Sequence, residues 1–147
     1  MPHTYTQNAI HVVFNTKDRA KLIPKDFQSR LWSYAAGICQ NDKIFVHAIG
    51  GMDNHIHLLI EILPTLALAK AVNAVKSNSS RWANEEGFPF AWQQGYAAFS
   101  VSASNVPAVM RYIQNQESHH KKMSFEVEFI ALLKKHGVEH DPKFVFS

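Results

Sequence analysis

The stretch Asn54-His55-Ile56-His57-Leu58-Leu59-Ile60-Glu61 predicts a β-strand, because apolar residues fill it without glycine or proline. Successive side chains of a strand point to opposite faces of its sheet. One face of this strand therefore carries only apolar side chains, namely Ile56, Leu58, Ile60 and Ile62. The other face carries His55, His57, Leu59 and Glu61. We expect helices to cover the apolar face, whereas the two imidazoles lie about 7 Å apart, within reach of one metal ion.

The sequence on either side predicts three more strands and four helices. Short β-rich runs predict strands at residues 8–15, 43–50 and 95–102, and the turn formers of residues 50–54 predict a hairpin into the histidine strand. Residues 84–94 read as a loop and residues 143–146 as a short extended piece. The helices are predicted from Pro24 through Ile38, from Pro64-Thr65 (with Thr65 as N-cap) to about Trp82, from a cap at Ser104 or Asn105, and over residues 124–136 between the N-cap Ser124 and Gly137.

This β-α-β-β-α-β order with appended helices predicts an α+β fold of the ferredoxin-like, split βαβ type. In that arrangement an antiparallel sheet has two helices on one face, and here a further helix is appended. The chain has 147 residues, a length that predicts one domain over residues 1–147.

Composition narrows the class of protein. The net charge is +3 and the isoelectric point about 9.0, values that are compatible with a nucleic-acid partner. Cys39 is the only cysteine, which excludes an internal disulfide and a cysteine-based zinc site. The first residues show no secretory signal, and no apolar run approaches the roughly 18 residues of a membrane span. We therefore expect a cytoplasmic protein with no membrane partner.

The histidine pair alone is ambiguous, since two hydrogen-bonded histidines on a partly buried strand would look the same. A metal site needs a third ligand. The third predicted helix offers Tyr112 and Gln116, which lie four residues apart at one edge of its apolar stripe. Tyr112 is also explained as an ordinary tyrosine at the edge of a core, and Gln116 as a surface residue.

The ordered set of motifs resembles the single-tyrosine HUH transposases of small insertion sequences and their REP-associated relatives. The matching segments are residues 10–16 with Arg19, residues 52–59 around His55-Ile56-His57, residues 75–82, residues 90–96, and Tyr112-Ile113-x-x-Gln116 followed by His119-His120. The resemblance spans nearly the whole chain. His-x-His alone is a weak signal, whereas the ordered set is a strong one.

The resemblance implies a role for each matching residue. His55, His57 and Gln116 would bind a divalent ion, Mg²⁺ or Mn²⁺, and Tyr112 would be the catalytic nucleophile. The family cleaves and rejoins single-stranded DNA at hairpin-bearing ends through a 5′-phosphotyrosine. Its members act as homodimers in which the tyrosine helix of one subunit completes the metal site of the other. The segment before the tyrosine helix, residues 102–105, is compatible with a hinge for such an exchange.

Contacts with DNA are expected from basic side chains along the same motifs. Such side chains bind phosphates, and Trp82 or Trp92 can stack on an unpaired base. Each basic residue is equally explained as a solvated charge, and each tryptophan as part of the core. The predicted DNA-binding residues are Lys17, Arg19, Lys76, Arg81, Lys121 and Lys122.

Three other readings stay open. The element order is also that of an RRM, and residues 95–101 partly match its aromatic motif, so a non-catalytic nucleic-acid-binding module is one alternative. A domesticated transposase that only binds hairpins is a second. A metal-dependent hydrolase of small molecules is the third, but it leaves Tyr112 unexplained and the sequence places no carboxylate close to the histidine motif.

Overall fold

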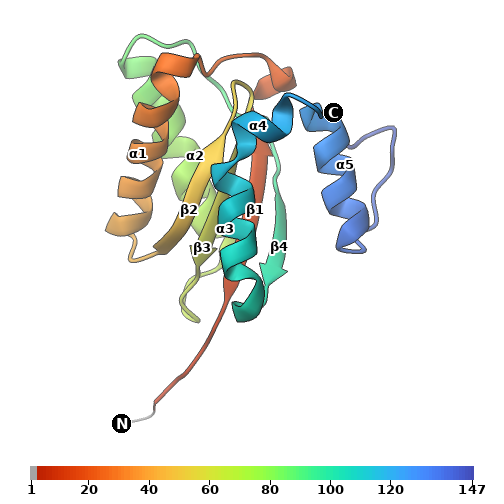
Figure 1. Cartoon of the computed structure of the whole chain (residues 1–147). Coiled ribbons are helices and arrows are strands. Elements are labelled where there is room, and N and C mark those ends of the chain that lie inside the picture. Colours follow the sequence, from red (N-terminus) through yellow and green to blue (C-terminus); the bar gives the residue numbers. More distant parts are fainter. Residues whose placement is uncertain (1–2) are drawn as a thin grey trace.

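The computed structural model describes residues 3–147; residues 1 and 2 of the predicted domain lie outside the described residues. Its centre is a four-stranded antiparallel sheet in the order β2-β3-β1-β4 (Figure 1). The strands are β1 (Ala9–Asn15), β2 (Phe45–Gly51), β3 (His55–Glu61) and β4 (Ala97–Val101). Strand β3 lies between β2 and β1 and is antiparallel to both, so β1 and β2 are parallel. This is the split βαβ arrangement, and the predicted fold class is confirmed.

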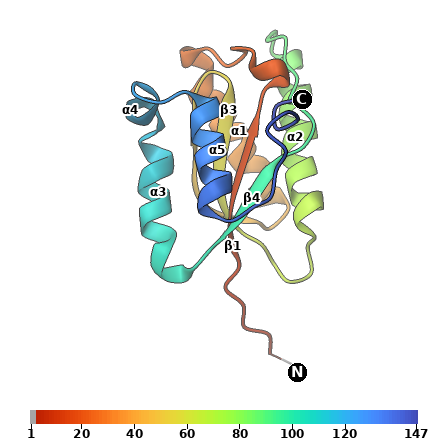
Figure 2. The same cartoon turned by 90° about the vertical axis from the view of Figure 1, so that its right-hand side faces the viewer.

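Helices cover both faces of the sheet. Along the chain, two helices connect strands and three more follow β4. Figure 2 shows helices on either side of the sheet. Short 3-10 turns, η1 (Lys17–Arg19) and η2 (Ala103–Asn105), precede α1 and α3. The helices are α1 (Lys25–Asn41), α2 (Leu68–Glu85), α3 (Val106–Gln114), α4 (Gln116–His120) and α5 (Phe125–Lys135). None of the helices within residues 3–147 combines the length and apolarity needed to cross a bilayer.

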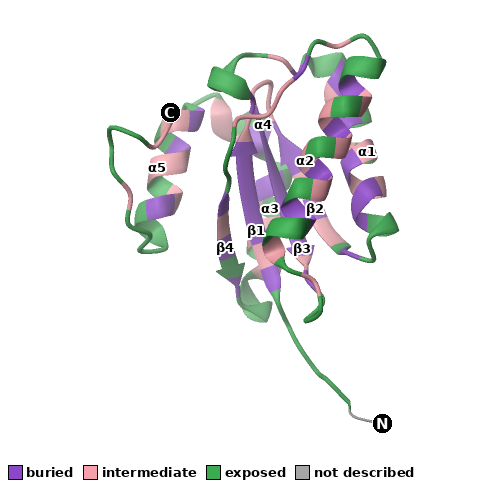
Figure 3. Ribbon diagram, turned by 180° about the vertical axis from the view of Figure 1, so that it is seen from behind, coloured by how far each residue is buried: buried purple, intermediate pink, exposed green. Residues whose placement is uncertain are grey.

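The apolar face of β3 packs against α1 and α2, as the alternation predicts. Ile56 and Leu58 are 0% exposed, and they join one core cluster with Ala35 and Ile38 of α1 and Val72 of α2. The buried residues of the sheet form a continuous layer beneath these helices (Figure 3). Full burial of several branched side chains here supplies the main apolar contribution to folding.

The histidine face is covered by α3 on the β2 side and by α5 on the β4 side (Figure 1). Helix α3 lies very close to β2 at Gly50. A Cβ at this position would lie 2.5 Å from the carbonyl oxygen of Ile113, so only glycine permits this approach. The close packing holds Ile113, in the last turn of α3, directly against β2.

Three local predictions are wrong. Helix α2 begins at Leu68 with Ala67 as its N-cap. Thr65 lies in a separate turn before it, because the amide of Leu66 donates a hydrogen bond to the carbonyl oxygen of Leu63. The third predicted helix is interrupted at Asn115, whose backbone (φ −100°, ψ 22°) ends α3 before Gln116 begins α4. The C-terminal residues 143–146 form turns instead of an extended piece, because the Asp141 carboxylate accepts a hydrogen bond from the amide of Lys143. The predicted cap at Ser124 is confirmed, since its hydroxyl accepts from the amide of Val127.

Candidate active site

The two histidines of β3 lie beneath α3 and α5 with their side chains fully buried, each 0% exposed. The Nδ1 atom of each ring is held by a neighbour. His57 Nδ1 lies 2.8 Å from His11 Nε2 on β1, and His55 Nδ1 lies 2.8 Å from Asn54 Oδ1. Fixing Nδ1 orients an imidazole and leaves Nε2 free to bind another group. Both Nε2 atoms point toward the same place, in line with the predicted metal pair.

Gln116 and Tyr112 converge on this place from the other side. Gln116 is 2% exposed, and its Oε1 lies 2.9 Å from His55 Nε2. The half-buried Tyr112 ring lies against His57, with 5.7 Å between ring centroids. The break at Asn115 turns Gln116 inward at the start of α4, while Tyr112 remains on the last turn of α3. The structure therefore brings together the four predicted residues of the metal and nucleophile sites, all from one chain.

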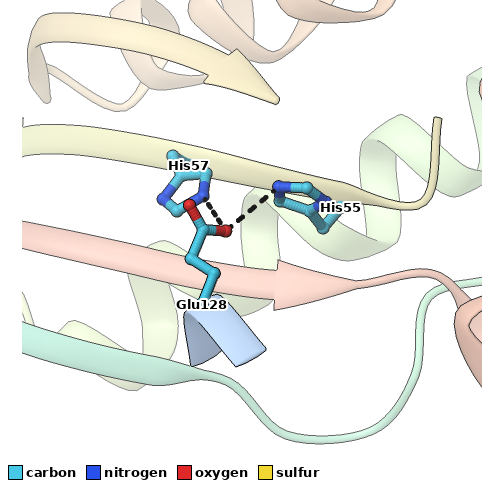
Figure 4. Close-up of side chains that lie close together, drawn as sticks. All are labelled: His55, His57 and Glu128. Atoms are coloured by element: carbon cyan, nitrogen blue, oxygen red, sulfur yellow. Dashed lines mark hydrogen bonds and ion pairs between the residues drawn. The ribbon is translucent and has the colours of Figure 1, made fainter. Parts of the chain in front are cut away.

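A carboxylate that the sequence reasoning did not select, Glu128 of α5, occupies the centre of this group. Its Oε1 lies 3.1 Å from His57 Nε2 and 3.4 Å from His55 Nε2 (Figure 4). Its Oε2 accepts hydrogen bonds from the Tyr112 hydroxyl and, at 3.0 Å, from Gln116 Nε2. Glu128 is 1% exposed. The expectation that no carboxylate accompanies the histidine motif is therefore wrong.

The sequence carries a signal for the burial of Glu128. Glu126 and Glu128 lie in the first turn of α5, where acidic residues favourably meet the helix dipole. However, Glu128 also lies three residues after Phe125 and four before Leu132, within the apolar stripe of this helix. An acidic residue within an apolar stripe predicts a buried, paired carboxylate, whereas Glu126 lies at the side and forms an ion pair with Arg19.

Two further histidines complete the group. His120 Nε2 donates to Glu128 Oε1 at 3.1 Å, and its Nδ1 lies 2.7 Å from the carbonyl oxygen of Met123. His119 Nε2 lies 3.3 Å from Glu128 Oε2 and 3.5 Å from the Tyr112 hydroxyl. Together with His55 and His57, these residues surround one carboxylate with imidazoles. Imidazole and carboxylate groups in this proximity are typical of metal sites, and His55, His57 and Glu128 offer ligand atoms within 4.8 Å of one another.

Burial and Glu128 decide the charges of the group. Burial lowers the pKa values of His11 and His55 to about 3, with a smaller effect from His57, so both rings are neutral near pH 7. Burial alone would raise the pKa of Glu128, but hydrogen bonds from His120 and His57 hold it well below its usual range. Burial opposes protonation of His120, yet the contact with Glu128 raises its pKa overall. Burial and Glu128 together raise the pKa of Tyr112, so the phenol keeps its proton.

The hydrogen-bond pattern around His55 suits a cation. A neutral imidazole has one ring proton, and Asn54 Oδ1 can only accept, which places that proton on Nδ1 of His55. The unprotonated Nε2 then faces Gln116 Oε1 at 2.9 Å and Glu128 Oε1 at 3.4 Å, both of which are acceptors. Three electron-rich atoms that face one another without a proton between them fit a bound metal ion.

Tyr112 lies between two cavities. On one side, a cavity of about 330 Å³ between α3 and α5 has His11, Lys135 and His136 in its wall. On the other side, a more open cavity of about 790 Å³ is lined by Lys121 and Lys122. Tyr112 thus lines two hollows, each with at least one lysine in its wall.

The predicted DNA-binding residues lie in several separate parts of the structure. Lys121 and Lys122 line the open cavity beside Tyr112. Lys76 donates to the carbonyl oxygens of Gln93 and Gly95, at 2.7 and 2.8 Å, and holds the loop before β4. The remaining three lie away from both cavities: Lys17 and Arg19 in η1, and Arg81 on α2 beside Glu85.

The aromatic residues argue against the RRM-like reading. An RRM binds bases on exposed aromatic side chains of its sheet. Here Phe99 of β4 is 4% exposed and stacks on His136, beneath α5. Trp82 stacks on Tyr34, and Trp92 donates from Nε1 to the Ser79 hydroxyl at 2.9 Å, so both pack within the protein.

Comparison with protein families gives a match over residues 4–116 to the family described as "Transposase IS200 like". The chain belongs to the IS200-like transposase family. The family match begins before β1, includes His55, His57 and Tyr112, and ends at Gln116. Helix α5, which carries Glu128, lies beyond the matched residues.

Two solved structures share the fold of this IS200-like transposase. A candidate transposase from Deinococcus radiodurans R1 matches with a TM-score of 0.61 at 21% identity, over 79% of this chain and 96% of that chain. A REP-associated tyrosine transposase bound to a REP hairpin matches with a TM-score of 0.60 at 13% identity, over 82% of this chain and 73% of that chain. A comparison with curated proteins gives no match.

Proposed function

We propose that this transposase cleaves and rejoins single-stranded DNA at hairpin-bearing ends through a covalent bond between Tyr112 and a 5′-phosphate. One observation carries the proposal. Tyr112 packs against the buried group of His55, His57 and Gln116, and it also lines two hollows that contain lysine side chains. A scissile phosphate has DNA on both sides, and two hollows that meet at one tyrosine suit a strand that passes across it.

His55, His57 and Gln116 would hold a divalent ion, Mg²⁺ or Mn²⁺, through their Nε2 and Oε1 atoms. Such an ion supplies Lewis-acid polarisation of a phosphate oxygen and stabilises negative charge on the leaving oxygen. His11 and Asn54 hold the two imidazoles in position through their Nδ1 atoms, at 2.8 Å each. The fixed geometry means that little reorganisation is needed when the ion and DNA bind.

Tyr112 would attack the scissile phosphorus with its phenolic oxygen. A bond forms between Oη and phosphorus, the bond from phosphorus to the 3′-oxygen breaks, and the phenol proton is lost while the 3′-oxygen becomes a hydroxyl. The number of phosphoester bonds is unchanged, so a 3′-hydroxyl can later reverse the reaction and rejoin DNA. Glu128 orients the hydroxyl before the reaction, because the phenol donates to Oε2.

A labelled-adduct experiment tests the nucleophile. The protein would be incubated with Mn²⁺ and single-stranded oligonucleotides in which a hairpin is flanked by randomised segments, and separated on a denaturing gel. We expect a covalent adduct with the native protein and none with Tyr112→Phe. A 3′-label should remain on the protein and a 5′-label should not, because the bond is to the 5′-phosphate.

The matched control is Tyr34→Phe, which removes one hydroxyl from α1 on the opposite face of the sheet. This variant should form adducts like the native protein. Adducts that persist with Tyr112→Phe would show that another residue is the nucleophile. A 5′-label on the protein would show the opposite polarity of cleavage.

We further propose that Tyr112 serves the metal site of its own chain, as the contacts within one chain support; the homodimer itself stays a prediction. Mixing Tyr112→Phe with His55→Ala tests this. If Tyr112 acts within its chain, no mixed assembly contains an intact site, and the mixture should form no adduct. If the tyrosine is exchanged between subunits, a mixed dimer contains one intact site and adducts should reappear. Recovery of adduct formation in the mixture would contradict the arrangement within one chain.

A further inference from the structure

We propose that Glu128 is a fourth protein ligand of the divalent metal site, and its only anionic one. The inference rests on the proposed metal site of His55, His57 and Gln116 and adds to it a residue from α5. Helix α5 lies beyond residues 4–116, the part of the chain that matches the IS200-like family.

Three separations among the four donor groups match those of ligands around one ion. Two ligands at right angles, each about 2.1 Å from an ion, lie about 3.0 Å apart, and a tetrahedral angle increases this to about 3.4 Å. Glu128 Oε1 lies 3.1 Å from His57 Nε2 and 3.4 Å from His55 Nε2. Gln116 Oε1 lies 2.9 Å from His55 Nε2. Glu128 therefore has the spacing expected of a ligand in the same shell as the histidines.

The two carboxylate oxygens of Glu128 contact different groups in this arrangement. Oε1 faces the two Nε2 atoms of His55 and His57 and also accepts from His120 (Figure 4). Oε2 faces away from this point and accepts from Gln116 and Tyr112. One oxygen can thus bind the ion while the other keeps the amide and the phenol in position. Each carboxylate oxygen has two lone pairs, so the contacts are compatible.

The packing of α5 supports a fixed position for Glu128. The Ser124 hydroxyl caps the helix, and Phe125 stacks on the His55 ring with 4.4 Å between centroids. Leu133, two turns later, is 6% exposed beneath the same helix and packs with Phe99. Glu128 thus projects inward from a helix that packs against the protein both before and after this residue, so the position of its carboxylate is fixed.

An anionic ligand changes what the site binds. With two imidazoles and an amide, the protein ligands are neutral, and hard divalent cations such as Mg²⁺ and Mn²⁺ bind more tightly when a carboxylate joins the shell. Glu128 would therefore let the protein retain Mn²⁺ before DNA arrives. The ion would then have a smaller net charge with which to attract a phosphate.

The test is a Mn²⁺ titration of the full chain without DNA, followed by electron paramagnetic resonance of the free ion. We expect Glu128→Gln, which keeps the size of the side chain, to weaken Mn²⁺ binding at least about tenfold. Glu128→Asp keeps the charge but shortens the side chain by one methylene. Its Mn²⁺ affinity should lie between those of the native protein and Glu128→Gln. The matched control is Glu126→Gln on the same turn, which should stay within about twofold of the native affinity, and His55→Ala should lose binding.

A second readout distinguishes direct ligation from support of the fold. Co²⁺ can replace Mn²⁺, and its visible absorption bands depend on the atoms bound to the metal. Glu128→Gln should shift these bands in a protein whose circular dichroism is unchanged. Native affinity and an unshifted spectrum in that variant would overturn the proposal, as would absence of Mn²⁺ binding to the native protein. Because no DNA is present, these outcomes are independent of the adduct experiment, whose failure would instead contradict the proposed function.

Discussion

The two faces of β3 are built from alternate residues of one strand, yet they depend on different kinds of contact. On one face, Ile56 and Leu58 pack against α1 and α2, where any well-fitting apolar partner serves. On the other, His57 contacts two particular atoms, one from His11, 46 residues earlier, and one from Glu128, 71 residues later. The first face needs shape and apolarity, whereas the second needs specific directions and charges. The apolar face thus mainly stabilises the fold, whereas the histidine face positions the groups of the candidate site.

The largest expected effect on stability lies on the apolar face. Leu58 is 0% exposed, and Leu58→Ala removes buried methyl groups and leaves a cavity. We expect the free energy of unfolding to fall by about 2–5 kcal/mol, measured by urea denaturation. Mn²⁺ affinity of the protein that remains folded should stay within about twofold, because no metal ligand is altered.

The control is Leu63→Ala, at a side chain that is 46% exposed, where the change should be no more than about 0.5 kcal/mol. A large loss of Mn²⁺ affinity in folded Leu58→Ala would show that the two faces are coupled. In that case the division between a stabilising face and a chemical face would not hold.

The apolar face could be predicted from the sequence, and the reason is physical. Alternation along residues 54–61 assigns each side chain of the strand to a face without knowledge of any partner. The element order then restricts the sheet to few topologies. Boundaries were less certain, because caps depend on which hydrogen bond the local backbone makes. Thus Ser124 caps α5 as predicted, whereas Thr65 lies in a turn before α2.

The histidine face could be predicted only in part. Tyr112 and Gln116 were found because their spacing matches a known family motif, although a break at Asn115 separates them into two helices. The apolar stripe of α5 indicates that Glu128 is buried, but its partners depend on how α5 packs against the sheet, which no local pattern specifies. The residue pair of His11 and His57 likewise depends on the register of β1 against β3. Directional contacts between distant segments are known only once the fold has placed them.

The smaller expected effect concerns pH and belongs to the histidine face. Burial lowers the pKa values of His11 and His55 to about 3, from an ordinary value of 6.5. Between these values the unfolded chain binds more protons than the folded chain, so the free energy of unfolding rises with pH. In metal-free protein, we expect each of these histidines to lower stability by about 1 kcal/mol between pH 7 and pH 5.5. Urea denaturation in the presence of a chelator measures this.

His11→Asn tests the assignment, because asparagine does not titrate and its amide group can either donate to His57 Nδ1 or accept from it. The pH-dependent loss of stability in this variant should be smaller by about 1 kcal/mol over the same interval. Leu58→Ala, in contrast, should lower stability at every pH and leave the pH dependence as in the native protein. An unchanged pH dependence in His11→Asn would mean that His11 is not held neutral by burial. A changed one in Leu58→Ala would mean that the apolar face also controls the protonation of the histidines.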